Sequence, residues 1–180
     1  MIVELFNDPS YRPGTDNKSA YALCHFTDGY QNPYGTPHGI RLFNGDLEVN
    51  SCLLIGSGGT TVHPTSAILD GNSLLVCCGD SVFSLELPSL RLRWQTQVDL
   101  ATCFQIYSIE EEYIVHGEVK ISRLNRQGDI VWSFSGCDIF VSLDSETTFV
   151  LHDDYIALVD WEKNKYDLDF NGRVIRSTVR

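Results

Sequence analysis

The fold is decided by one stretch, Ser66–Gln97, which reads SAILDGNSLLVCCGDSVFSLELPSLRLRWQTQ. Short runs of β-branched, aliphatic and aromatic residues alternate in it with acidic, glycine-containing or polar turns, which is the pattern of β-strands joined by tight turns. Read along the chain, it gives a strand, an acidic turn, a strand, a tight turn, a strand, a polar turn and a strand. The stretch therefore predicts one antiparallel four-stranded meander.

The same pattern returns twice, as FQIYSIEEEYIVHGEVKISRLNRQGDIVWSFS from Phe104 and as IFVSLDSETTFVLHDDYIALVDWEKNKYDLDF from Ile139. An aromatic residue marks the last strand of each segment, namely Trp94, Trp132 and Tyr166, at spacings of 38 and 34 residues. Four-stranded repeats of about 40 residues are typical of β-propeller blades. Because one meander cannot bury both of its faces, we expect the repeats to stack face to face.

The N-terminal third reads as a divergent fourth repeat. Ile2–Phe6 and Ala20–Phe26 have strand character, and Asn44-Gly45 is a strong hairpin signal between strands at 40–43 and 46–49. We assign that hairpin to the outer two strands of the first blade. The connection between the second and third strands is then a long loop that starts at Asp28.

The predicted fold class is all-β, with about four antiparallel four-stranded meanders forming a small β-propeller or a propeller-like fragment. We expect a single repeat domain over residues 1–180, with approximate blades at 1–55, 60–98, 100–136 and 137–180. Arg173–Val179 reads as one extra strand. If it met Ile2–Phe6 in a shared terminal blade, the ring would close and no apolar edge would stay open.

Two segments, GDSVFSLELPSLRLRWQTQ and GEVKISRLNRQGDIVWSFS, resemble the repeats of quinoprotein-type (PQQ-like) β-propellers, in which a valine–aromatic hairpin precedes a tryptophan strand. The resemblance extends over about residues 66–170. Such propellers usually have more blades than this chain can hold, and the Trp-Asp and Gly-His signatures of WD repeats are absent. The resemblance implies the fold without implying quinone binding, so we expect no cofactor.

The charge balance restricts the partners. Asp and Glu number 24 against 13 Lys and Arg, a net charge of −11. This composition argues against nucleic acid and against anionic membranes, and it is compatible with a basic protein partner or simply with solubility. No apolar run approaches the ~20 residues that a membrane span needs. The start of the chain lacks signal-peptide features, so we expect a cytoplasmic protein with free thiols at Cys24, Cys52, Cys77, Cys78, Cys103 and Cys137.

No motif predicts catalysis or metal binding. Gly56–Gly59 lacks the Lys-Ser/Thr of a phosphate loop. Cys77 and Cys78 point to opposite faces of one strand and cannot share a metal ion. His116 and His152 occupy equivalent repeat positions without an evident third ligand. There is no G-x-S-x-G elbow, so we expect a protein that is not an enzyme.

The turns suggest a binding surface instead. In a meander, the turns between second and third strands lie at the same end of every blade, and here they are acidic. The long first-blade loop adds tyrosines, which are enriched in binding hot spots. Turns favour Asp and Gly in any case, which is the alternative explanation. The predicted partner-binding residues are Asp28, Tyr30, Tyr34, Asp80, Glu118, Asp153 and Asp154.

Two functions follow as hypotheses. The first is a non-catalytic protein-binding scaffold, in one version an immunity- or inhibitor-type protein that neutralises a basic toxin or nuclease. The second is a small-molecule or carbohydrate site, binding or enzymatic, in a central channel lined by the first strand of each blade. The first strands at Phe104–Tyr107 and Ile139–Leu143 are mostly apolar, which favours a filled core over a ligand channel.

Overall fold

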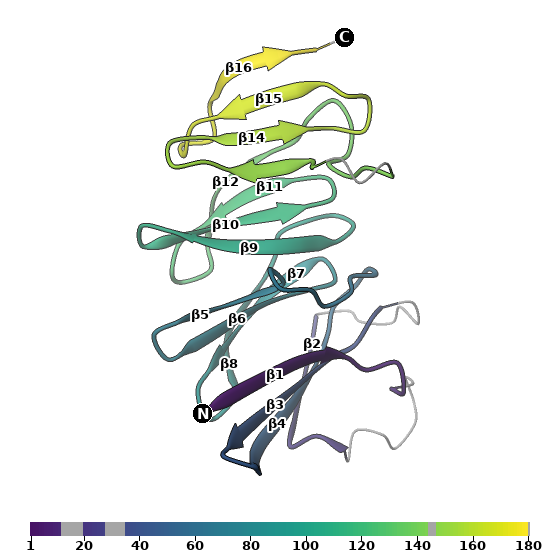
Figure 1. Cartoon of the computed structure of the whole chain (residues 1–180), viewed down its shortest axis with the longest axis vertical. Helices are drawn as coiled ribbons and strands as arrows, with labels where there is room; N and C mark the ends of the chain where they lie inside the picture. The colour runs from purple at the N-terminus through teal and green to yellow at the C-terminus, as the bar shows by residue number, and fades with distance from the viewer. Residues whose placement is uncertain (12–19, 28–34, 144–146, 180) are drawn as a thin grey trace.

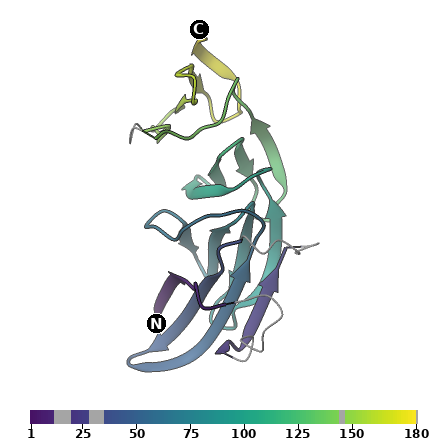
Figure 2. The same cartoon turned by 90° about the vertical axis from the view of Figure 1, so that its right-hand side faces the viewer.

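The computed structural model describes residues 1–11, 20–27, 35–143 and 147–179. In these ranges the chain forms four four-stranded β-sheets. The sheets stack in chain order, with the two termini at opposite ends of the stack (Figure 1). Viewed from the side, the stack bends into an open arc (Figure 2). The described ranges contain no helix that could cross a membrane.

Each sheet is built from one continuous part of the chain. The first contains β1 (Ile2–Asn7), β2 (Leu23–Phe26), β3 (His38–Asn44) and β4 (Leu47–Ile55). The second contains β5 (Ala67–Asp70), β6 (Ser73–Cys78), β7 (Ser81–Glu86) and β8 (Arg91–Gln97). The third contains β9 (Cys103–Ile109), β10 (Glu112–Gly117), β11 (Ile121–Leu124) and β12 (Ile130–Phe134). The fourth contains β13 (Phe149–Leu151), β14 (Ile156–Val159), β15 (Lys165–Leu168) and β16 (Val174–Thr178). The all-β prediction is confirmed.

The core lies between the sheets, and β6 shows why its sequence is apolar throughout. Leu74 and Val76 pack against the first sheet, whereas Leu75 and Cys77 pack against the third. Successive side chains of a strand point to opposite faces, so a strand inside a stack has no solvent face. Burying each such side chain stabilises the fold by about 1.5–3 kcal/mol.

The outer strands join neighbouring sheets through one repeated contact. Trp94 in β8 donates its indole N–H to the Arg126 carbonyl at 3.1 Å, and its ring lies over Gly128 in the β11–β12 turn. At the next interface, Trp132 in β12 donates to the Phe170 carbonyl at 2.9 Å in the β15–β16 turn. Each tryptophan therefore fixes its own sheet to a turn of the following one.

A histidine takes this role at the first interface. The Nε2 atom of His25 in β2 lies 2.9 Å from the Leu90 carbonyl in the β7–β8 turn. Asn50 in β4 adds amide hydrogen bonds to the Pro88 and Ser89 carbonyls at 3.0 and 2.9 Å. The first sheet is therefore also fixed to the turn between the last two strands of the following sheet, but through a histidine and an asparagine instead of a tryptophan.

The first sheet differs from the predicted meander. Its strand order is β1-β3-β4-β2, and β2 runs parallel to β4. Tyr11 and Tyr21 precede β2 and pack with Leu53 and Ile55 on the outer face, so β2 enters at the far edge of the sheet. The predicted hairpin at Gly45 is present, but its strands occupy the middle of the sheet instead of the outer two positions.

The strands of the first sheet also run opposite to their counterparts in the second. Ser57 follows β4 and accepts a hydrogen bond from the Asp80 N–H, at the start of β7. Asn50, near the start of β4, bonds to Pro88 beyond the end of β7. β4 and β7 are therefore antiparallel across the interface.

The predicted ring closure is wrong. β16 pairs with β15 as the fourth strand of the last sheet, and β1 pairs with β3 at the other end of the stack (Figure 1). The error began at Ile139–Leu143, which is not a strand. Phe140 donates its N–H to the Glu118 carbonyl at 2.6 Å, and the Ile139 carbonyl accepts the Trp161 N–H at 2.8 Å. These backbone groups bond to turns, so the stretch is a linker.

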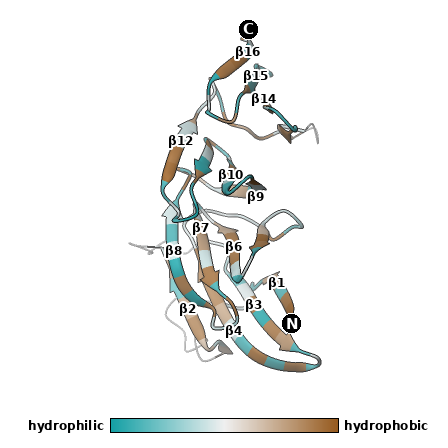
Figure 3. Cartoon of the chain, turned by 90° about the vertical axis from the view of Figure 1, so that its left-hand side faces the viewer, coloured by the Kyte–Doolittle hydropathy of each residue, from teal (hydrophilic) through white to brown (hydrophobic). Residues whose placement is uncertain are grey.

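This shift moves the aromatic marker of the last sheet. The pairs Ser84–Trp94, Arg123–Trp132 and Asp167–Arg176 are equivalent, since a register shift follows each at the same place. Arg176 therefore stands where the other two sheets have tryptophan, and Tyr166 belongs to β15. All five residues of β16 (VIRST) are exposed, and Val174 and Ile175 make the start of this strand hydrophobic (Figure 3).

The tryptophan contact predicts a difference between two turn glycines. A Cβ at Gly128, where φ is +88°, would lie 2.5 Å from Cδ2 of Trp94, whereas a Cβ at Gly71, where φ is +58°, would meet nothing within 4 Å. We expect Gly128→Ala to lower the free energy of unfolding by about 3 kcal/mol, from left-handed strain and overpacking together. Gly71→Ala, the matched control, should cost about 1 kcal/mol from strain alone. Urea denaturation measures both, and equal costs would contradict the docking role of Trp94.

Candidate partner-binding surface

The turns of the last three sheets meet at two opposite edges of the stack. The linker edge contains the turns at 79–80, 117–120 and 160–164, together with the connections between sheets. The hairpin edge contains the turns at 71–72, 110–111 and 152–155. Figure 1 shows the two edges on opposite sides of the stack.

Backbone hydrogen bonds identify the equivalent positions on the linker edge. In each of the last three sheets, the turn between the second and third strands donates one backbone N–H. The acceptor is a carbonyl in the connection that leads into the first strand of the same sheet. The donor and acceptor pairs are Asp80 to Ser57 at 2.6 Å, Glu118 to Thr102 at 2.8 Å and Trp161 to Ile139 at 2.8 Å.

Asp80 is a structural residue. It is only 6% exposed, and its carboxylate accepts hydrogen bonds from the Ser81 hydroxyl at 2.8 Å and the Gln97 amide at 3.0 Å. Its carbonyl also accepts the Val98 N–H at 2.9 Å. Asp80 therefore fixes the turn and cannot present its charge to a partner, whereas Glu118 is partly exposed on the same edge.

Asp153 and Asp154 do not lie where the sequence predicted them. They occupy the turn between the first and second strands of the last sheet, which is on the hairpin edge. The predicted equivalence of His116 and His152 fails for the same reason, because His116 ends β10 at the linker edge and His152 belongs to the 152–155 turn. Asp28, Tyr30 and Tyr34 lie outside the described residues.

The structure thus brings four exposed carboxylates to equivalent turns of consecutive sheets. Glu110 and Glu111 form the tip of the β9–β10 hairpin, and Asp153 and Asp154 form the tip of the β13–β14 hairpin. The Glu110 side chain is 80% exposed. The acidic turns were visible in the sequence. Because the prediction began the last sheet one strand too early, it placed the two pairs at opposite edges.

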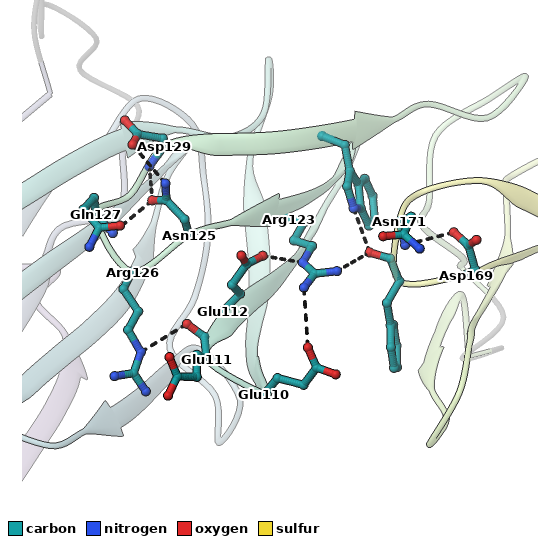
Figure 4. A network of polar contacts seen from close by, with 12 residues as sticks. Glu110, Glu111, Glu112, Arg123, Asn125, Arg126, Gln127, Asp129, Asp169 and Asn171 are labelled. Atoms are coloured by element: carbon teal, nitrogen blue, oxygen red, sulfur yellow. Dashed lines mark hydrogen bonds and ion pairs between the residues drawn. The ribbon is translucent and has the colours of Figure 1, made fainter.

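The arginines near these tips are engaged in structural contacts (Figure 4). Arg123 pairs with Glu112, donates to the Phe170 carbonyl at 2.5 Å in the next sheet, and lies 3.8 Å from Glu110. Arg126 donates to the backbone carbonyl of Glu111 at 3.1 Å, and the Glu111 side chain is exposed. The tips therefore keep a negative charge despite the neighbouring guanidinium groups.

His116 lies between the third and fourth sheets. Its Nε2 is 3.1 Å from the Phe140 carbonyl, its Nδ1 is 3.1 Å from the Gln105 side-chain amide, and its ring stacks on Phe149 at 4.9 Å. Burial lowers the pKa of His116 to about 4, so the ring is neutral. A neutral ring has one N–H, which can be donated either to the Phe140 carbonyl or to Gln105 Oε1, and that oxygen also accepts the Tyr107 hydroxyl at 3.0 Å.

His38 is fully buried between the first two sheets. Burial also lowers its pKa to about 4. Within the described part of the chain, neither ring nitrogen has a partner in hydrogen-bond geometry, although the Thr36 and Pro37 carbonyls lie nearby. A charged ring there would be costly, so this histidine is also neutral.

The cysteines behave as small apolar residues. All six are free thiols. Cys77 and Cys78 face different core clusters, as the strand geometry predicted. Burial raises the pKa of the Cys52 and Cys78 thiols to about 12, which makes them unreactive at neutral pH. In the described ranges, no three His, Cys, Asp or Glu side chains converge as metal ligands.

No family model and no curated protein matches the sequence. Solved structures do match. BamB from Moraxella catarrhalis aligns with 97% of this chain and 52% of its own, at 14% identity and a TM-score of 0.54. The designed protein Ika4 aligns with 66% of this chain and 77% of its own, at 7% identity and a TM-score of 0.50. The WD40 domain of Neurospora crassa Pan2 aligns with 64% of this chain and 38% of its own, at 16% identity and a TM-score of 0.48.

The similarity to BamB establishes a β-propeller type of fold, and it confirms the resemblance to PQQ-like propeller repeats. The chain spans about half the length of BamB. At such low identities the shared property is the fold.

The two neutral histidines predict a loss of stability in acid. Between pH 6.5 and about 4, His38 and His116 are protonated in the unfolded chain and neutral in the folded one. The free energy of unfolding therefore decreases as the pH is lowered through this range. Each contributes a loss of up to about 3 kcal/mol by pH 4. Urea denaturation at pH 7, 6, 5 and 4 would measure the slope. His38→Leu should flatten it, and an unchanged slope in that variant would contradict the assignment.

Proposed function

We propose that this chain is a non-catalytic protein-binding scaffold with a basic protein as its partner, and that the hairpin edge of the last two sheets is the contact surface. β-Propeller folds are commonly protein-binding scaffolds. The observation that carries the choice of surface is the placement of Glu110, Glu111, Asp153 and Asp154 at equivalent hairpin tips. An immunity- or inhibitor-type role toward a basic toxin or nuclease fits this proposal.

Several features support a binding role over a chemical one. The Cys52 and Cys78 thiols are buried and protonated, and His38 and His116 are buried inside interfaces. At the β9–β10 and β13–β14 tips the exposed side chains include four carboxylates, which attract a cationic surface without enclosing a small molecule. A net charge of −11 extends this attraction beyond direct contact, over a Debye length of about 8 Å at physiological ionic strength.

The test starts with affinity purification of the partner from the native host, followed by association kinetics. We expect the variant Glu110→Lys, Glu111→Lys, Asp153→Lys, Asp154→Lys to associate about tenfold more slowly at low salt, because steering charges act mainly on the association rate. The melting temperature should change little, since these side chains are exposed. Raising the salt concentration should reduce the difference between this variant and the wild type.

The linker edge supplies the matched control. Glu118→Lys combined with Glu162→Lys reverses two carboxylates at the opposite edge and should leave association nearly unchanged. If this control slows association as much as the hairpin-edge variant, the contact surface is wrong. If purification recovers no basic protein, the proposed partner class is wrong.

A further inference from the structure

We propose that Cys77 and Cys103 form a reversible redox pair, in which a peroxide converts the two thiols into a disulfide that links the second sheet to the third. Cys77 belongs to β6, and Cys103 begins β9. The pair lies inside the protein and apart from the hairpin tips. Oxidation therefore changes how firmly the two sheets are joined and leaves the contact surface as it is.

The two thiols meet in one core cluster. Both side chains are fully buried, and both belong to the apolar cluster between the second and third sheets. The Cys103 Sγ lies 3.3 Å from the carbonyl of Ser81, which pairs with the last residue of β6. Burial raises the pKa of Cys103 well above its usual value, and a hydrogen bond with the Cys77 thiol raises it further. The two sulfur atoms are therefore within reach of each other.

Backbone contacts hold Cys103 in this position. Its N–H donates to the Gly79 carbonyl at 2.7 Å, and the Thr102 hydroxyl donates to the same carbonyl at 3.1 Å. Gly79 directly follows β6, so the start of β9 is fixed against the end of β6. Groups that are already held together react with one another far faster than groups that must first meet.

The other buried cysteines form no equivalent pair. Cys78 is the neighbour of Cys77 in β6, but it faces the cluster between the first two sheets, which also contains Cys52. Cys78 affects the pKa of Cys52 through charge, without a hydrogen bond between the two thiols in the described part of the chain. Cys77 and Cys103 are therefore the pair that we expect to close first.

The chemistry takes two steps. The thiolate of one cysteine attacks hydrogen peroxide, which breaks the O–O bond and yields a sulfenic acid and one water molecule. The second thiol then attacks that sulfur, which forms the S–S bond and releases a second water molecule. Two electrons pass from the thiols to the peroxide, and both thiol protons end in water. A thiol reductant reverses the reaction by disulfide exchange.

The linker ahead of β9 controls access to the pair. Cys103 is buried and its pKa is raised, whereas the reactive form of a thiol is the thiolate. Leu100, in the same linker, is 71% exposed. Local opening of the linker at 98–102 therefore admits the peroxide, and the rate of oxidation follows that opening.

The test uses the full chain carrying Cys137→Ser, which removes the exposed thiol. We expect hydrogen peroxide to remove two hydrogen atoms from the intact mass and a thiol reductant to restore them. Non-reducing peptide mapping should find Cys77 joined to Cys103. The oxidised protein should melt about 5–10 °C higher, because the disulfide cross-links two sheets. Cys77→Ala should abolish the mass loss, and Cys78→Ala, the matched control in the same strand, should keep it.

Several results would overturn the proposal: an unchanged mass, added oxygen atoms on cysteine without a disulfide, a disulfide between any other two cysteines, a melting temperature that does not rise, or the same mass loss in Cys77→Ala. If Cys77→Ala does not fold, the peptide map decides, because it needs no substitution at either position of the pair.

Discussion

The first three sheets have apolar residues on both faces, and this constraint determines the architecture. A lone meander of this kind would expose Leu75 or Leu74 whichever way it turned, so it must be covered on two sides. Stacking buries the apolar side chains of both faces. The hydrogen bonds from the indole N–H groups of Trp94 and Trp132 determine how their sheets are placed on the following ones. The turns that receive those rings need residues such as Gly128 that leave room for them.

The two ends of the stack meet the constraint differently. Tyr11 and Tyr21 cover the outer face of the first sheet. On the last sheet, Arg176 replaces the tryptophan and forms an ion pair of 3.3 Å with Asp167, which makes the corresponding face polar. Where the first sheet meets the second, the Val62 N–H bonds to the Asn7 side chain at the end of β1, and a groove lined by Val3, Leu5 and Ala67 lies between β1 and β5.

The middle of the fold could be predicted from the sequence because its turns are short and chemically explicit. Asp70-Gly71, Asn125 and Gly128 mark strand ends that a local pattern reveals. Ile139–Leu143 misled the prediction since a linker that buries Phe140 has the same composition as a strand. The parallel placement of β2 depends on packing by Tyr11 and Tyr21, which no local pattern encodes. Counting Ile139–Leu143 as the first strand of the last sheet shifted the strand assignment by one, and this shift placed Asp153 and Asp154 at the wrong edge.

The net charge of the chain overstates the negative charge that a partner meets at the surface. Asp80, Asp99 and Asp160 are almost fully buried and use their carboxylates inside the protein. Asp99 accepts the Val119 and Lys120 N–H groups at 2.9 and 2.8 Å. Burial alone would raise the pKa of Asp160, but hydrogen bonds, chiefly from Asn164, hold it below its usual range. These aspartates close turns at the linker edge, where the sequence is acidic for structural reasons. The carboxylates of Glu110, Glu111, Asp153 and Asp154 at the opposite edge are exposed, so they are accessible to a partner.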